Sequence, residues 1–329
     1  MKKVINKNNI SNILACWLAS DTYGGVREDK SISATSLLRS IQQRVLNRRV
    51  INNPEIVEIV EVSTLLKSAM GTAIHKAIQD VWENDKLRIS GLSNLGVSFD
   101  RIDKIKVNPE NPNSEDTNIY FEKRVFKEFH GWNINGQFDL VVNGDVHDFK
   151  STSTYTYLNK IKEKDYIIQG SIYRWLAPEL ITGDFITIHY IFTDWNKIYL
   201  LSNPQYPRTP FVSIQLPLMS LVETEEYIYT RIRENELYEH SEVLPECDNK
   251  TLMIDDVWQY FSKQGATRAS KNFTSALEAN AYMTSKSTGY IAKKPAEPKG
   301  CNWCNCRGIC NQYSKFIENG AIKDEGINR

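Results

Sequence analysis

The chain has 329 residues, with 40 Lys and Arg side chains against 40 Asp and Glu, so its formal net charge is zero. This length allows one large domain or two small ones with a sizeable core. The charge balance excludes a protein whose overall field attracts nucleic acid or membrane, so an anionic polymer would have to bind where basic residues are locally concentrated. No apolar run approaches bilayer length. The stretch ILACWLAS is short and follows the polar NKNNISN, which argues against a signal peptide. We expect a soluble, cytoplasmic protein without a membrane partner.

The first third of the chain is predicted to be largely helical. The segment SATSLLRSIQQRVLNRR, residues 33–49, predicts a helix capped by Ser33 or Thr35. A stronger helix is predicted over 64–84, where one apolar stripe is the expected core face. The members of this stripe are Leu66, Met70, Ile74, Ala77, Ile78 and Val81. The Pro-, Asn- and Ser-rich segment 107–118 predicts a loop.

Alternating β-type segments follow, and Asn143-Gly144 between two of them predicts a tight hairpin turn. The predicted strands cover 119–129, 132–142, 146–150, 185–195 and 197–202, and the predicted helices cover 165–176, 219–236 and 270–283. The tail 286–315 has six basic residues against one acidic residue. It is therefore the most credible place for a contact with a nucleic-acid backbone.

The hairpin GQFDLVVNGDVHDFKS, residues 136–151, carries two aspartates and a lysine. Residues of equal parity share a strand face, so Asp148 and Lys150 point the same way, and the turn brings Asp139 within reach of Asp148. Carboxylates bind Mg²⁺ or Mn²⁺, and a nearby lysine steadies a nucleophilic water and the scissile phosphate. The same pattern is also typical of a solvated surface salt bridge. Gly136 and the hydroxylated, aromatic STSTYTY after the lysine favour a binding site.

Two predicted helices add polar residues on either side of this hairpin in sequence. In MGTAIHKAIQDVW, His75 lies one turn after Gly71, on the flank of the apolar stripe. In IIQGSIYRWL, Gln169 and Tyr173 lie at i, i+4 on one line of the helix. Each feature alone is more typical of a half-exposed histidine or of an ordinary amphipathic edge. Their order along the chain is what links them to the hairpin.

The succession G-x3-H, G-x2-D, D-x-K and Q-x3-Y, on helix, strand, strand and helix, resembles the RecB-like branch of the PD-(D/E)XK nuclease superfamily. That branch includes phage exonucleases and CRISPR-associated RecB-like exonucleases. The resemblance covers about residues 33–202 and implies an α/β fold with a restriction-endonuclease-like core, a mixed central sheet flanked by helices. It implies metal binding by His75, Asp139, Asp148 and the Phe149 carbonyl, a catalytic Lys150, a downstream motif of Gln169 and Tyr173, and an additional acidic position at Glu122.

A cysteine cluster lies near the C-terminus, in GCNWCNCRGICNQ. Thiolates this close together suit Zn²⁺ or an iron–sulfur cluster. The RecB-like branch often carries a C-terminal C-x2-C-x5-C, which Cys301, Cys304 and Cys310 match. In its iron–sulfur members a fourth cysteine comes from near the N-terminus, where RSIQQRVL has none. The candidates for the fourth ligand are therefore Cys306 and Cys247, which we favour, and Cys16. A Cys₄ site has no open coordination position, so we expect a structural metal that pins the basic tail to the core.

We expect three parts: an N-terminal helical segment over 1–60, a nuclease core over 61–215, and a C-terminal helical region over 216–329 with the cysteine metal site. The expected function is that of a Mg²⁺- or Mn²⁺-dependent deoxyribonuclease, an exonuclease of phage DNA recombination or replication. Its partners would be single- or double-stranded DNA and recombination or replication proteins. One alternative is an endonuclease or a CRISPR-type spacer-processing nuclease of the same superfamily. Another is a non-catalytic, metal-organised nucleic-acid-binding protein, against which the complete set of Asp139, Asp148 and Lys150 argues.

Overall fold

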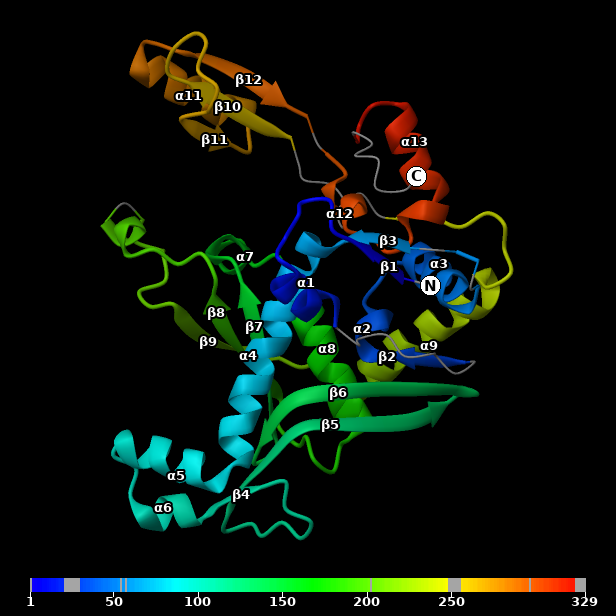
Figure 1. Ribbon diagram of the computed structural model, residues 1–329, viewed down its shortest axis with the longest axis vertical. Coiled ribbons are helices and arrows are strands. Elements are labelled where there is room, and N and C mark those ends of the chain that lie inside the picture. Colours follow the sequence, from blue (N-terminus) through cyan, green and yellow to red (C-terminus); the bar gives the residue numbers. More distant parts are fainter. Residues whose placement is uncertain are drawn as a thin grey trace. The chain divides into compact units, whose positions relative to one another are not determined.

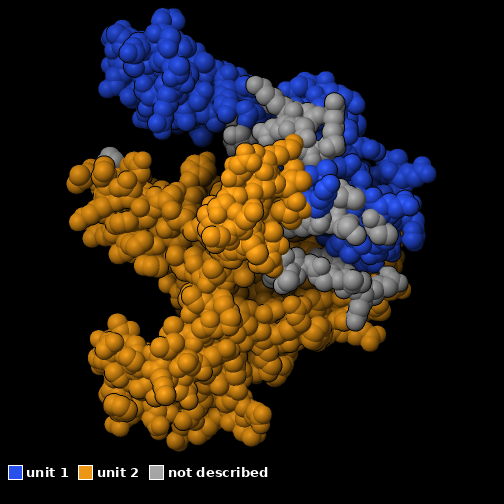
Figure 2. Space-filling view, in the orientation of Figure 1, with its two compact units in different colours: residues 1–3, 40–59, 238–329 blue, residues 4–39, 60–237 orange. Residues whose placement is uncertain are grey.

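The computed structural model describes residues 2–20, 30–53, 55–56, 58–201, 203–247, 256–295 and 297–322. The chain groups into two compact units, which Figure 2 shows in different colours. Unit 1 contains residues 1–3, 40–59 and 238–329, and unit 2 contains residues 4–39 and 60–237. The compact units therefore place residues 40–59 with the C-terminal region, whereas the sequence predicts 1–60 as one segment.

The described part of unit 2 is built on a seven-stranded mixed sheet, in which β2 lies beside β6 (Figure 1). The other strands follow the order β4-β5-β6-β7-β8-β9. The pairs β2–β6, β4–β5 and β7–β8 are parallel, and the remaining pairs are antiparallel. The strands are β2 (Ser31–Ser33), β4 (Ile105–Val107), β5 (Thr117–Phe129), β6 (Trp132–Val142), β7 (Asp145–Thr152), β8 (Phe185–Phe192) and β9 (Phe211–Pro217). The expected mixed α/β architecture is thus present.

One edge of β6 is shared by two neighbouring strands, and the sheet forks between them. β2 pairs with residues 133–135 of β6, and β7 pairs with residues 140–142. Among the described strands, neither β2 nor β7 pairs with residues 136–139, which therefore line the fork. On the other edge of β6, the β5 ladder skips Glu122, which lies opposite Asp139 in the register and has a φ of 47°. A positive φ is uncommon for a residue with a side chain, and such strained positions concentrate at functional sites.

Helices α4 (Leu66–Glu83) and α8 (Glu163–Leu176) cover opposite faces of this sheet. The α8 side holds the main core, whose largest fully buried side chains in the sheet and helix include Phe138, Ile134, Ile172, Trp175, Ile186 and Ile188. On the other face, Ile78 and Trp82 of α4 pack with Phe149 in a smaller cluster. Gly136 allows α8 to approach β6 closely, because a Cβ at this position would lie 2.9 Å from Tyr173 Cε1.

The predicted core stripe of α4 is wrong for three of its members, which are well exposed: Leu66 at 44%, Met70 at 38% and Val81 at 43%. Ile78 of the stripe does pack on the sheet, and the face that it shares with Trp82 also carries Gly71 and His75. A Cβ on Gly71 would lie 3.4 Å from Ser151 Oγ of β7. The face that packs on the sheet thus carries polar site residues, so apolar periodicity did not reveal it.

Two other predicted helices are interrupted in the structure. The segment 33–49 divides into α2 (Ala34–Leu37), capped by Ser33, and α3 (Ile41–Asn52). The division arises because Ser40 and Gln43 form a capping box that starts a new helix. The segment 270–283 begins as strand β11 (Lys271–Phe273), and helix α11 (Ala276–Lys286) starts only where Ser275 accepts hydrogen bonds from the backbone N–H groups of Leu277 and Glu278.

The strand predicted over 197–202 is also wrong. Residues Lys197–Leu201 form a 3₁₀ helix, η2, with Ile198 and Leu201 70% and 93% exposed, and Ser202 lies outside the described residues. The strand that pairs with the other edge of β8 is β9 instead. Its burial alternates along the strand, and the alternation of Val212, Ile214 and Leu216 with Ser213 and Gln215 is a period-two signal that could have predicted it.

The hairpin between β6 and β7 is confirmed, because Asn143 and Gly144 have φ values of 48° and 92°, as a tight type I′ turn requires. The helices near 165–176 and 219–236 are confirmed as α8 and α9 (Leu221–Tyr238). The other elements up to α9 are β1 (Lys2–Ile5), α1 (Asn12–Ala19), β3 (Glu58–Glu61), η1 (Val62–Leu65), α5 (Asp85–Asn94), α6 (Phe99–Asp103) and α7 (Thr154–Leu158). Among the described helices, none combines the length and apolarity needed to cross a bilayer.

The C-terminal part of unit 1 is not purely helical, contrary to prediction. It contains an antiparallel sheet in the order β11-β10-β12, in which β10 is Val257–Phe261 and β12 is Tyr290–Lys294. The aromatic residues of VWQYF favour a strand. The segments that follow are α12 (Lys299–Asn302), η3 (Arg307–Ile309) and α13 (Asn311–Glu318).

Candidate metal centre

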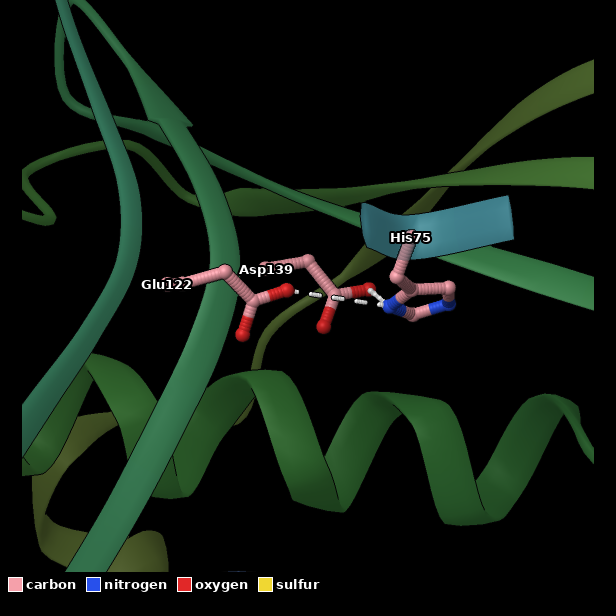
Figure 3. Close-up of side chains that lie close together, drawn as sticks. All are labelled: His75, Glu122 and Asp139. Carbon is pink, nitrogen blue, oxygen red and sulfur yellow. Dashed lines mark ion pairs between the residues drawn. The ribbon is translucent and has the colours of Figure 1, made fainter. Parts of the chain in front are cut away.

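Three potential metal ligands converge at the fork of the sheet. Figure 3 shows His75 of α4 pointing towards Asp139 and Glu122, which come from neighbouring strands. His75 Nδ1 lies 3.5 Å from Asp139 Oδ2 and 3.8 Å from Glu122 Oε1. Within the described part of the chain, these three residues are the one group of His, Cys, Asp and Glu side chains whose ligand atoms all lie within 4.8 Å of one another.

Asp148 is the most buried charged group of the site. Its side chain is 1% exposed, and it comes from the strand position opposite Asp139. Lys150 Nζ forms a salt bridge with its Oδ2 at 2.5 Å, and apart from this contact neither carboxylate oxygen has a hydrogen-bond partner among the described residues. Burial first, and then the charge of Asp139, raise the pKa of Asp148 to about 6, against the lowering effect of Lys150. A carboxylate this buried is normally paired with a cationic group, fully hydrogen-bonded or bound to a metal, and Lys150 supplies the pairing at one of the two oxygens.

The Phe149 backbone links the two aspartates to the histidine. Its N–H donates to Asp139 Oδ2 at 2.8 Å, and its carbonyl oxygen lies 2.9 Å from His75 Nε2. His75 therefore turns Nε2 towards the Phe149 carbonyl and Nδ1 towards Asp139 and Glu122.

The His75 imidazole takes up positive charge in the absence of a metal. Burial lowers its pKa, but Asp139 and Glu122 outweigh this effect and raise the pKa to about 10. An imidazolium therefore lies between two carboxylates and the Phe149 carbonyl. Once deprotonated, the imidazole Nδ1 and the two carboxylates form a ligand set that suits Mg²⁺ or Mn²⁺.

Lys150 lies on the face of the sheet that α8 covers, where residues of this helix contact its ammonium group. Lys150 Nζ donates to Gln169 Oε1 at 3.5 Å, and Gln169 Nε2 donates to the Tyr173 hydroxyl at 2.8 Å. The Tyr166 ring lies under the ammonium group, 5.2 Å from Nζ to the centroid. Gln169 and Tyr173 are thus beside the lysine, as the sequence predicts.

Two residues that hold site side chains in place were not predicted from the sequence. Tyr166 lies one turn before Gln169 on α8, a spacing that could have identified it. Gln137 donates to Glu122 Oε2 at 2.7 Å and accepts from Arg124 Nη2 at 2.8 Å, which holds Glu122 towards the fork. Gln137 and Glu122 lie on adjacent strands in a register that the sequence does not show.

The cysteines of unit 1 form a second cluster. Cys247, Cys301, Cys304, Cys306 and Cys310 line one small cavity together with Gln42 and Gln43 of α3. Burial raises the pKa of Cys247 and Cys310, and that of Cys301 to about 12, and neighbouring thiols raise each further. Cys16 is exposed on α1 in unit 2 and does not line this cavity.

The sulfur atoms of the cluster have different neighbours. Cys247, Cys301, Cys304 and Cys310 influence one another electrostatically. Cys306 Sγ donates to the Gln43 carbonyl at 3.6 Å. Cys247 Sγ contacts Gln42 Oε1 and Ser40 Oγ, both at 3.0 Å.

Comparisons with known proteins identify no family. No family model matches the chain, and no curated protein matches it. Among solved structures, the crystal structure of SSO0001 is similar with a TM-score of 0.38 and 14% identity, over 68% of this chain and 85% of that one. A phage-related exonuclease from Haemophilus somnus 129PT is similar with a TM-score of 0.24 and 18% identity, over 36% of this chain and 57% of that one. Both TM-scores are below 0.5, so the functional argument rests on the site itself.

Proposed function

We propose that the chain is a metal-dependent deoxyribonuclease with a PD-(D/E)XK-type core, and that it acts as an exonuclease. The observation that carries this proposal is Asp148, a fully buried carboxylate that lies opposite Asp139 and pairs with the ammonium group of Lys150. Like charges this close are costly unless a cation lies between them. The resemblance to RecB-like nucleases supports a role in DNA recombination or replication, and the proposal includes activity in the cytoplasm of the cell or phage host.

In this proposal Mg²⁺ or Mn²⁺ would be held by His75, Asp139, Asp148 and the Phe149 carbonyl. Glu122 would supply a further carboxylate beside the ion. When bound, such an ion lowers the pKa of a coordinated water and neutralises charge on the phosphate.

Lys150 contributes a fixed positive charge where the phosphoryl oxygens carry negative charge during hydrolysis. Gln169 and Tyr166 hold its ammonium group, and Tyr173 fixes the orientation of Gln169 through its hydroxyl. These contacts keep the lysine in place without neutralising it.

The test is digestion of end-labelled linear DNA beside covalently closed circular DNA, with Mg²⁺, with Mn²⁺ and without divalent cation. We expect cation-dependent shortening of the linear DNA and intact circles. Nicked or linearised circles would show an endonuclease of the same superfamily. DNA binding without any cation-dependent product would overturn the proposal in favour of a non-catalytic binding protein.

We also propose that Cys247, Cys301, Cys304 and Cys310 bind a structural iron–sulfur cluster, with Cys306 outside the ligand set. Four thiolates on a single zinc lie about 3.8 Å apart, because each Zn–S bond is about 2.3 Å. Among the described residues no three cysteine sulfurs lie within 4.8 Å of one another, a wider spacing that suits a cluster better than zinc. Ser40 and Gln42, at the start of α3, would thereby be tied to the C-terminal segment through Cys247.

Anaerobic purification, metal analysis and an absorption spectrum test this assignment. The wild type and Cys306→Ser should contain iron and show a broad visible absorption, and Cys247→Ser should lose both. Stoichiometric zinc without visible absorption would show that the cysteines bind zinc and not an iron–sulfur cluster. Loss of metal in Cys306→Ser with retention in Cys247→Ser would reverse the choice of the fourth ligand.

A further inference from the structure

The small sheet of unit 1 has one face covered by a helix. Tyr282 of α11 contacts Tyr260 edge-on, with ring centroids 5.1 Å apart, and contacts Phe273 at 5.2 Å. Ala279 of the same helix is fully buried. Because side chains alternate along a strand, the residues next to Tyr260 in β10 point to the other face.

That other face carries a stacked aromatic pair. The register places Phe261 beside Tyr290, and their rings are nearly parallel, with centroids 5.0 Å apart and an angle of 8°. Gln259 lies on the same face and donates to Asn272 Oδ1 at 3.3 Å across the strands. Both rings are half-buried, and among the described residues no helix covers them as α11 covers Tyr260.

Positive charge is concentrated at the end of the sheet that carries this pair. At the opposite end, Lys293 pairs with Asp256 at 2.6 Å and Lys294 pairs with Glu297 at 3.3 Å. Lys263 and Arg268 lie in the loop that follows Phe261, are exposed, and have no ion pair with a carboxylate among the described residues, whereas Lys271 and Lys286 contact the Tyr282 ring on the covered face. In a chain of zero net charge, this is a local positive patch beside an aromatic platform.

We propose that the open face of β10 and β12 binds single-stranded DNA. Bases would stack on Phe261 and Tyr290, the amides of Gln259 and Asn272 would meet base edges, and Lys263 and Arg268 would contact phosphates. Stacking needs bases with a free face, so the surface selects single strands over duplex. The choice of DNA rests on the proposed nuclease function, whereas the binding does not depend on cleavage.

The test is fluorescence anisotropy of a labelled oligothymidine with the full chain, without added divalent cation so that the strand stays intact. Phe261→Leu and Tyr290→Leu keep apolar volume but remove the ring, and each should weaken binding at least about fivefold. Tyr290→Phe keeps the ring and should bind like the wild type. Leu277→Ala changes an 80% exposed residue of α11 and is the matched control.

A second pair of variants avoids the packed rings. Lys263→Glu and Arg268→Glu change exposed loop residues, so they should fold normally, weaken binding and reduce its salt dependence. Unchanged affinity in the folded leucine and glutamate variants, or equal affinity for duplex, would overturn the proposal. Binding that persists without any cation-dependent cleavage would count against the nuclease function alone, and cleavage without binding at this face would count against this inference alone.

Discussion

Asp139 lies opposite Asp148 at the first unpaired step between β6 and β7. The ladder ends at Leu140 and His147, and the Phe149 N–H donates to the Asp139 carboxylate instead of to the neighbouring strand. Separation of the strands therefore brings two carboxylates together at the fork. Lys150, His75 and a cation are the positive groups that can make this arrangement stable.

Lys150→Ala should abolish cleavage and leave the fold intact. The ammonium group faces the site, and loss of one such electrostatic contact costs roughly 100-fold or more in rate. Cleavage rates and thermal melting of the purified variant measure both effects. Lys162→Ala, which changes a half-exposed lysine paired with Asp165, is the control and should cleave normally. Normal turnover of Lys150→Ala would remove this residue from the site.

Asp148→Asn should lose less stability than the wild type as the pH rises from 4 to 6 in the absence of divalent cations. The folded pKa of Asp148, about 6, lies above its unfolded value of 3.8, so the stabilising protonated form is lost as the pH rises from 4 through 6. The wild type should therefore lose melting temperature relative to Asp148→Asn over this interval. An equal change in the melting temperature of both proteins across this pH interval would contradict the burial argument.

His147 should have the opposite pH dependence. It stacks on His189, its Nδ1 lies 2.9 Å from His189 Nε2, and burial together with the neighbouring imidazole lowers its pKa from 6.5 to about 4. Its contribution to stability is present above pH 6.5 and lost as the pH falls towards 4. On acidification from pH 7 to 5, His147→Gln should lose less melting temperature than the wild type. An equal loss would show that this pair does not control acid stability.

Gly136→Ala should destabilise the protein by about 1–3 kcal/mol, because the new methyl group would press on Tyr173 and Leu176 of α8. Displacement of Tyr173 should also disturb Gln169 and slow cleavage. Gly91→Ala in the exposed helix α5 is the matched control, since a Cβ there meets no atom within 4 Å. The control should be neutral or stabilising by up to about 1 kcal/mol. Denaturant unfolding measures both, and equal stability of the two variants would refute the close packing at Gly136.

Local signals account for the parts of the fold that the sequence predicts. The Asn143-Gly144 turn and period-two alternation identify the hairpin, and strand parity alone places Asp148 and Lys150 on one face. The Gln169 and Tyr173 spacing places both beside Lys150 because α8 is a regular helix.

Other features depend on contacts between distant parts of the chain, and the sequence does not show them. Apolar periodicity did not identify the packing face of α4, because the face that contacts the sheet includes His75 and Gly71. The strain at Glu122 and its contact with Gln137 follow from the β5–β6 register. Cys247 reaches the cysteine cavity from a segment remote in sequence from the four tail cysteines, so spacing alone could not show that it lines the cavity with them.

Binding of Mn²⁺ tests the central claim most directly, and electron paramagnetic resonance measures it without any substrate. Oxygen ligands suit Mn²⁺ better than thiolates do, so the cysteine cavity should not compete. The account predicts a bound ion in the wild type that is lost in the Asp139→Asn, Asp148→Asn double variant and retained in Cys247→Ser. A folded wild type that binds no Mn²⁺, or a double variant that binds it as tightly, would contradict the account.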